Sequence, residues 1–278
     1  RIKKVAESYR LLRNSLRFQL SNLYDFDPTK HAIAHDQLTP LDRWMMDAWS
    51  RVEREVFEAF GRYEFHIVYQ KLSQFTAVEL SSIYHDLVKD RLYSDAAASQ
   101  ARRSTQTVLH HILRQLSQAL SPMLVFTADE AWEFIPGVLE GDSVHLQEWK
   151  PSEFKLSDQE NADWVRWMAL RDQVLAKLED ARREKIIGKS LEAKISVQLP
   201  TDEVNALKAH HAVLREIMNV SQLEWIEGEA LKIQVAKAEG TKCKRCWHWE
   251  LEVGSHEQHP EICNRCVDAV EAQATISV

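Results

Sequence analysis

Apolar residues recur at every third or fourth position along the first half of the chain, which is the pattern of amphipathic α-helices. Five stretches show it, and we predict helices over residues 2–20, 40–60, 63–93, 101–120 and 127–135. The segments that separate these stretches are short and polar. Helices with one apolar stripe each, joined by short loops, are typical of an antiparallel helical bundle.

Local signals mark several helix ends. Thr39 precedes the second stretch as an N-cap, with Asp42 at the third helical position. Thr127 opens the sequence Thr-Ala-Asp-Glu, which predicts a capping box at the start of the fifth helix. The third stretch is too long to run unbroken, and we predict a bend at Ser81–Ser82.

The period of the pattern changes in the second half. Residues 137–157 show no clear period and are predicted to form a connector, after which a helix covers 158–185. Apolar and polar residues then alternate in LEAKISVQLP, which predicts a half-buried strand. Residues 221–226 and 231–238 predict two further strands, joined through 227–229.

The loop after the long helix of the second half carries a glycine between two lysines. We expect Gly188 to supply a positive φ or a helix stop between Lys185 and Lys189, because glycine adopts left-handed conformations without steric cost.

The composition favours a helix-rich globular protein. The chain is 45% hydrophobic and 28% charged, with seven glycines and seven prolines in 278 residues. No run approaches the roughly 20 apolar residues of a membrane span, and residues 1–18 have no apolar core or cleavage site of a secretory signal. We therefore expect a reducing, cytoplasmic setting. The chain begins with Arg1, so we expect it to be a piece of a longer protein.

The net charge of −7 argues against a general nucleic-acid coat, but the basic residues are unevenly distributed. Residues 1–20 carry six Lys or Arg against one Glu. A second cluster surrounds Lys89 and the start of the fourth helix. The arginines of these clusters that we single out as RNA-binding candidates are Arg10, Arg13, Arg17, Arg91, Arg102 and Arg103. Ordinary solvated faces are the alternative, and Arg91 can equally pair with neighbours inside the bundle.

All four cysteines lie in two Cys-x-x-Cys pairs near the end of the chain. Sixteen residues separate the pair Cys243 and Cys246 from the pair Cys263 and Cys266. Two such knuckles bring four thiolates to the tetrahedron that Zn²⁺ prefers, and a site with four protein ligands is structural, because no position stays open for water. Disulfides or a redox dithiol are the alternatives, and neither fits a chain without an export signal and with the motif repeated.

An aromatic residue follows the first cysteine pair directly. Trp247 stands beside Lys244 and Arg245, and a ring next to cations suits stacking on an unpaired base while phosphates are neutralised. The alternative is that Trp247 fills the small core of the knuckle while Trp249 lies outside, or the reverse.

Together these patterns predict a mainly α protein with a small α+β part. We expect an antiparallel helical bundle over 1–157, a helix with a small α+β junction domain over 158–240, and a zinc-binding knuckle over 241–278.

Several stretches, in this order along the chain, resemble the bacterial isoleucyl-tRNA synthetase family. They are RLLRNSLRFQLSNLYDFDP, LDRWM, YHDLVKDRLY, RRSTQTVLHHIL, SPMLVFTADEAWEFIP, KIIGKSLEAKISV and GTKCKRCWHWE with HPEICNRC. The resemblance covers essentially the whole chain. Valyl- and leucyl-type relatives share the bundle, so the Lys-Ser-Leu-Glu stretch and the cysteine knuckle carry the isoleucine assignment.

The resemblance implies the C-terminal, tRNA-binding part of a class I synthetase that attaches isoleucine to tRNA(Ile) with ATP. It implies that the bundle over 1–157 is of the class I anticodon-binding type and binds the anticodon stem and loop. It implies one structural zinc ion, tRNA(Ile) as partner, and catalytic and editing domains elsewhere in the full-length enzyme. The family's ATP-binding signatures, His-Ile-Gly-His and Lys-Met-Ser-Lys-Ser, do not occur here, so we expect the chain to be non-catalytic.

Two other functions stay open at this point. A zinc-knuckle helical adaptor that docks protein partners predicts no tRNA binding and little dependence on salt. A zinc hydrolase needs an open coordination position, which four cysteines do not leave.

Overall fold

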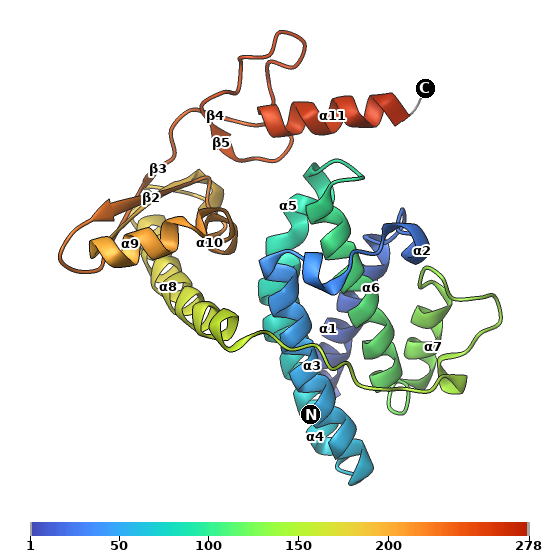
Figure 1. Cartoon of the computed structure of the whole chain (residues 1–278). Helices are drawn as coiled ribbons and strands as arrows, with labels where there is room; N and C mark the ends of the chain where they lie inside the picture. Colours follow the sequence, from blue (N-terminus) through green and yellow to red (C-terminus); the bar gives the residue numbers. More distant parts are fainter. Residues whose placement is uncertain (1, 277–278) are drawn as a thin grey trace. The chain divides into compact units, whose positions relative to one another are not determined.

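The computed structural model describes residues 2–276, which form two compact units (Figure 1). The helical unit comprises residues 1–92 and 97–156, and the mixed unit comprises residues 93–96 and 157–278. The fold is mainly helical with a small mixed sheet, as the sequence predicts. None of its described helices combines the length and the apolar composition that a membrane span requires.

Three long helices, α1 (Ile2–Ser21), α3 (Pro40–Gly61) and α6 (Gln100–Leu120), form the centre of the helical unit. They lie side by side in Figure 1, and α6 packs against both others. Two short elements, α2 (Pro28–His31) and the 3₁₀ turn η1 (His35–Gln37), link α1 to α3. The predicted cap of α3 is confirmed, because the Thr39 side chain accepts a hydrogen bond from the Asp42 amide at 3.5 Å.

The third predicted helix is continuous but changes its winding. It consists of α4 (Phe65–Phe75), a π-helical segment η2 (Thr76–His85) and α5 (Asp86–Ser94). The predicted bend at Ser81–Ser82 falls inside the π-helical segment, where the Ser82 hydroxyl donates to the Ala77 carbonyl at 2.7 Å. The chain therefore widens its turns at this point rather than breaking the helix.

The predicted start of the fifth helix is wrong. Helix α7 spans Val125–Glu133, and its N-cap position, Leu124, has no side-chain cap. Thr127 lies inside the helix and its hydroxyl contacts the Tyr9 hydroxyl at 3.1 Å. The Asp129 carboxylate does not cap the helix. It accepts a hydrogen bond from Ser143 Oγ at 2.7 Å, just before the 3₁₀ turn η3 (Val144–Leu146). A long-range contact therefore took the place of the local capping box.

The helical unit encloses an unusual polar centre around Asp42, which is fully buried. The carboxylate accepts hydrogen bonds from Tyr84 Oη and Ser104 Oγ, each at 2.5 Å, and from Thr105 Oγ1 at 3.1 Å. It also pairs with Arg91 at 3.2 Å. Burial and the adjacent Asp42 raise the pKa of Tyr84 well above its ordinary value, so the phenol stays a donor.

The mixed unit begins with α8 (Asp158–Arg183), which starts with a capping box of Ser157 and Glu160 that was not predicted. Strand β1 (Ala193–Leu199) follows the 3₁₀ turn η4 (Ser190–Glu192) and buries its four alternating apolar side chains, as predicted. The strands β2 (Gln222–Glu227) and β3 (Lys232–Lys237) both pair with β1, β2 parallel and β3 antiparallel. The order β2–β1–β3 puts the first strand in the middle.

Two short helices, α9 (Thr201–Lys208) and α10 (His211–Met218), connect β1 to β2. They were not predicted, because eight residues hold too little periodicity to be recognised. The parallel pairing of β1 with β2 requires such a crossover connection.

The expected glycine stop after α8 is wrong in its detail. The residue with positive φ is Lys185, at 61°, directly after the C-cap Glu184, whereas Gly188 is not among the positive-φ glycines. The Gly188 amide donates instead to the Glu192 carboxylate at 2.8 Å.

The last part of the mixed unit consists of the hairpin β4 (Thr241–Lys242) and β5 (Trp249–Glu250), followed by α11 (Asn264–Ile276). Gly240 introduces the hairpin with φ 87°, and a Cβ there would lie 2.4 Å from the Glu250 carbonyl oxygen. Only glycine fits this close approach.

Candidate zinc centre and nucleic-acid interface

The four cysteine sulfurs form one cluster. The ligand atoms of Cys243, Cys246, Cys263 and Cys266 all lie within 4.8 Å of one another, and all four residues are buried. The thiols are unbridged, and Cys246 Sγ lies 3.7 Å from Cys263 Sγ. This geometry excludes the disulfide alternative in the structure and matches a tetrahedral cation site.

Backbone hydrogen bonds hold the first knuckle in shape. The Cys243 amide donates to the His248 carbonyl at 2.8 Å, and the Trp247 amide donates to the Cys243 carbonyl at 3.1 Å. The amides of Arg245 and Cys263 both point at Cys243 Sγ, each at 3.4 Å. These two hydrogen bonds fix the position of the Cys243 sulfur, as partners around a metal ligand do.

The protonation of the cluster shows why it needs a cation. Burial raises the pKa of the Cys263 thiol to about 11, and a hydrogen bond to Cys246 raises the pKa of Cys266. The hydrogen bond from Cys266 lowers the pKa of Cys246, because it stabilises the Cys246 thiolate. Four thiolates at this spacing require a divalent cation, and Zn²⁺ with four sulfur ligands fits the donor set.

Trp247 lies outside the knuckle core. Its side chain is 57% exposed, and its backbone is left-handed with φ 68°. The Nζ atoms of Lys189 and Lys242 each lie 5.9 Å from the centre of its ring. Trp249 is the inner tryptophan, half-buried, with its amide donating to Ser221 Oγ at 2.8 Å. The interpretation of Trp247 as a core residue is therefore excluded.

The two cations predicted to accompany Trp247 differ in their surroundings. Lys244 is exposed and forms an ion pair with Glu261. Arg245 is half-buried, donates to the Ser94 carbonyl, and lies 3.7 Å from Cys266 Sγ. Its guanidinium therefore has a structural role. Lys189 and Lys242, which were not predicted as RNA contacts, are the cations that lie over the ring. Lys189 and Lys242 lie far apart in the sequence, so the sequence does not predict that both lie over the same ring.

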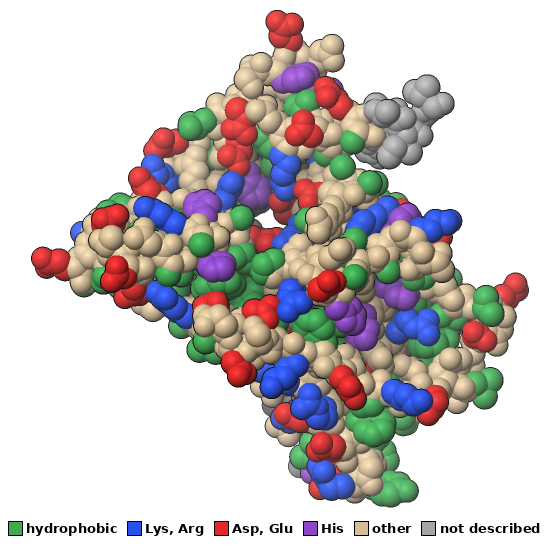
Figure 2. Space-filling view, in the orientation of Figure 1, with side chains coloured by type: hydrophobic (Ala, Val, Ile, Leu, Met, Phe, Trp, Pro, Cys, Tyr) green, Lys and Arg blue, Asp and Glu red, His purple; other side chains and the backbone are tan. Residues whose placement is uncertain are grey.

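The predicted arginine row on α1 exists. Arg10, Arg13 and Arg17 are all exposed, and within residues 2–276 no ion pair or hydrogen bond of their side chains is found. On the face drawn in Figure 2, cationic and anionic side chains are interspersed.

The other three arginines are inside the helical unit, which revises the expectation that they contact RNA. Arg102 is 3% exposed and binds both oxygens of Asp25, at 2.6 and 2.9 Å. Arg103 donates to the Asp25 carbonyl at 2.9 Å. Arg91 pairs with Asp42, which is the internal pairing considered from the sequence. Buried guanidinium groups need such partners, so these residues hold the bundle together.

Two family models match the chain. Residues 42–197 match the anticodon-binding domain of tRNA ligase, and residues 240–269 match a zinc finger found in FPG and IleRS. The first match covers more than half of the chain, which therefore belongs to the anticodon-binding domain family of tRNA ligases. The second match covers all four cysteines, so the predicted zinc site is confirmed.

Comparison with individual proteins indicates which tRNA ligase the chain is similar to. The chain is 40% identical over 268 residues to the isoleucine--tRNA ligase of Dichelobacter nodosus, covering 96% of the chain and 29% of the relative. It is 39% identical over 287 residues to that of Sodalis glossinidius, covering 97% and 30%. The resemblance predicted from the sequence is confirmed, and the chain spans about 30% of the length of these relatives.

Proposed function

We propose that this chain is the tRNA-binding part of an isoleucine--tRNA ligase that attaches isoleucine to tRNA(Ile) with ATP in the cytoplasm. The exposed ring of Trp247 between Lys189 and Lys242, on a loop ordered by the zinc site, carries the proposal. An indole plane offers a stacking surface to an unpaired base, and the lysines neutralise the adjoining phosphates.

The arginine row supports a second area of contact. Arg10, Arg13 and Arg17 stand one helical turn apart on α1, with exposed guanidinium groups. Groups of this kind bind the RNA backbone and orient it without reading its sequence. The catalytic and editing domains are the further partners of this chain in the complete ligase.

Replacing Trp247 by alanine is expected to weaken tRNA(Ile) binding by about 1–3 kcal/mol, the usual value of base–aromatic stacking. The backbone strain at φ 68° is the same for both residues, so zinc content and folding are expected to stay unchanged. The slope of log affinity against log salt is also expected to stay the same, because the indole neutralises no phosphate. Fluorescence anisotropy with labelled tRNA over a range of salt concentrations measures both quantities.

Two variants serve as controls. Leu251→Ala removes another exposed side chain near the same hairpin and is expected to bind tRNA as the wild type does. Lys189→Gln with Lys242→Gln is expected to flatten the salt plot by roughly 0.7 for each phosphate that is no longer neutralised. If Trp247→Ala binds like the wild type while it keeps its zinc, the stacking role is refuted. If the wild type does not bind tRNA at all, the adaptor function takes its place.

The chain by itself is expected to show no isoleucine-dependent exchange of pyrophosphate into ATP. Its sequence contains neither of the family's ATP-binding signatures. The measurement uses labelled pyrophosphate and protein freed from the host synthetase by an affinity tag. Exchange that rises in proportion to the amount of purified chain would refute the non-catalytic assignment.

A further inference from the structure

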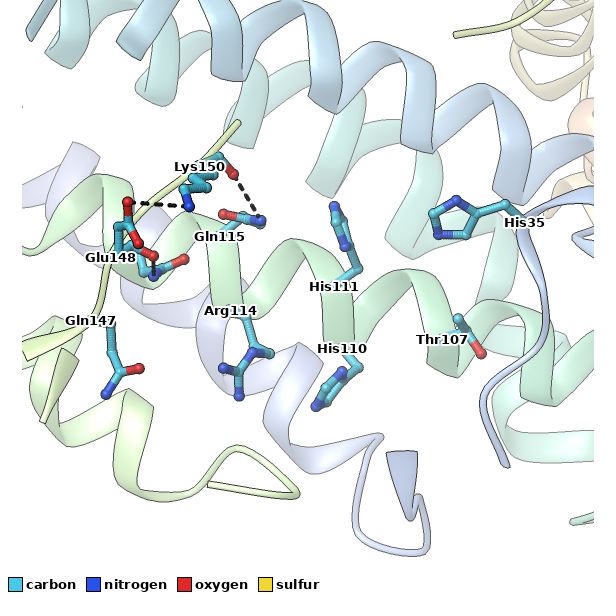
Figure 3. Close-up of a pocket in the computed structure, with 10 residues that line it drawn as sticks. His35, Thr107, His110, His111, Arg114, Gln115, Gln147, Glu148 and Lys150 are labelled. Atoms are coloured by element: carbon cyan, nitrogen blue, oxygen red, sulfur yellow. Dashed lines mark hydrogen bonds and ion pairs between the residues drawn. The ribbon is translucent and has the colours of Figure 1, made fainter. Parts of the chain in front are cut away.

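A polar pocket of about 540 Å³ lies on one face of α6, inside the helical unit (Figure 3). Its floor is the helix face that carries Thr107, His110, His111, Arg114, Gln115 and Gln118. Its rim consists of His35 from η1 and of three connector residues, Gln147, Glu148 and Lys150. In Figure 3, His110 and Arg114 project from one side of α6, and His111 and Gln115 from the other. This pocket is separate from the zinc centre and from the surface around Trp247.

Arg114 is a half-buried cation without an ionic partner in this pocket. Its guanidinium lies over the Trp132 ring, 4.6 Å from the ring centre, and no ion pair or hydrogen bond of its side chain is found in the described part of the chain. Burial lowers the pKa of Arg114, and the field of Asp142 offsets this only in part. The stacking holds the plane in place while its N–H groups stay available to an anion.

The neighbours of Arg114 include both donors and acceptors. Gln115 Oε1 is a buried acceptor without a partner among the described residues, and the Nε2 atoms of Gln115 and Gln118 donate to the Lys150 and Glu148 carbonyls at 3.4 and 3.2 Å. His111, three positions earlier on α6, has a buried Nε2 without a partner among the described residues. His110 Nε2 forms a hydrogen bond with the Pro136 carbonyl at 2.8 Å, and this leaves Nδ1 as the ring nitrogen that can take another partner. The rim has one carboxylate, Glu148, and Lys150 pairs with it at 3.2 Å. A cation would meet the charge of Arg114 here, whereas an anion would accept hydrogen bonds from the N–H groups of its guanidinium.

We infer that the α6 pocket binds a phosphate group through the guanidinium of Arg114. A phosphate offers the several acceptor oxygens that a guanidinium fork and neighbouring donors can share. The volume exceeds what a phosphate ion fills, which leaves room for an attached sugar. We assign this group to a phosphodiester of bound RNA, and this assignment rests on the proposed function. A small phosphorylated compound has the same chemistry, and the experiment below distinguishes the two sources of phosphate.

The test follows the imidazole ¹⁵N signals of the complete chain by NMR while inorganic phosphate is added against chloride of equal ionic strength. Phosphate is expected to move the signals of His110 and His111 in the wild type, and Arg114→Gln is expected to abolish that movement. Lys71→Gln is the matched control, since Lys71 is a half-buried cation of the same unit, paired with Glu55 and outside the pocket. His111→Gln assigns the signals and leaves Arg114 on Trp132.

The same variants are compared in tRNA binding. Arg114→Gln is expected to lower the salt slope by about 0.7–0.9, the contribution of one phosphate, while Lys71→Gln leaves the slope unchanged. If phosphate moves the histidine signals but Arg114→Gln leaves the salt slope of tRNA binding unchanged, the pocket binds phosphate and the phosphate does not come from RNA. If phosphate moves the histidine signals of a wild type that binds no tRNA, the phosphate site is supported and the proposed function is refuted.

Two results would overturn the site itself. One is that phosphate leaves the histidine signals of the wild type unmoved, and the other is that Arg114→Gln responds as the wild type does. If Arg114→Gln unfolds because its side chain no longer stacks on Trp132, Arg114→Lys replaces it. That variant keeps the charge without the planar fork, and it is expected to weaken the phosphate response.

Discussion

Cys263→Ser is expected to lose the zinc ion and to unfold the chain from about residue 240 onward, while the helices of the helical unit remain. The four buried cysteines form one cluster with Val253 and Ile262 packed against it, and the other buried apolar residues after 240 in the described part of the chain are Val267 and Ala269, so little apolar area remains without the metal. In small zinc modules the free energy of metal binding, about 10–16 kcal/mol at neutral pH, is also the free energy of folding. Elemental analysis and hydrogen exchange over residues 241–272 measure the two effects.

His259→Ala is the matched control for the zinc prediction. His259 lies between the two cysteine pairs but outside the sulfur cluster, so this variant is expected to keep one zinc ion per chain. Replacing zinc by cobalt gives a second measurement, because four thiolate ligands produce a strong absorption that an oxygen ligand weakens. Full zinc content in Cys263→Ser, or no zinc in freshly purified wild type, would contradict the assignment.

Asp42→Ala is expected to lower the free energy of unfolding of the helical unit by about 3–5 kcal/mol. The substitution leaves Arg91 as a buried cation without its carboxylate, and it leaves Tyr84, Ser104 and Thr105 as donors without their acceptor. Urea unfolding followed by circular dichroism measures the loss. The two units can unfold separately, so the transition of the helical unit is fitted on its own.

Asp36→Ala, an exposed aspartate in η1, is the control and is expected to change the free energy of unfolding by less than about 0.5 kcal/mol. The double variant Asp42→Leu with Arg91→Met is expected to be more stable than Asp42→Ala, because no unpaired charge stays buried. A small loss in Asp42→Ala, similar to that of Asp36→Ala, would show that the network does not stabilise the bundle.

The features that the sequence determined are those that depend on nearby residues. The spacing of the two cysteine pairs predicted the metal site, because a knuckle is a local turn that places its own two sulfurs. The alternation through Ala193, Ile195 and Val197 predicted β1, because side chains of a strand face opposite sides at successive positions. The hydroxyl of Thr39 predicted the start of α3 for the same reason, since its partner is three residues away.

The tertiary structure decided which side chains are buried and with which partners. Arg13 and Arg102 both stand on amphipathic helices beside other arginines, yet the first is exposed and the second is enclosed with Asp25, 77 residues away. Thr127 has the local sequence signature of an N-cap. In the structure it lies inside α7, where its hydroxyl contacts Tyr9, and Asp129 binds Ser143. Asp42 was predicted as a first-turn acid, and only the packing of α3, α5 and α6 made it the centre of a network.

The same division applies to the proposed RNA surface. The sequence placed an aromatic residue beside cations, but two tryptophans, Trp247 and Trp249, stood close to the first cysteine pair. The left-handed backbone at Trp247 turned that ring outward between Lys189 and Lys242, while the Trp249 amide turned toward Ser221. Periodicity and spacing describe a chain over a few residues, whereas burial depends on contacts between residues far apart in sequence, and those contacts form only when the chain folds.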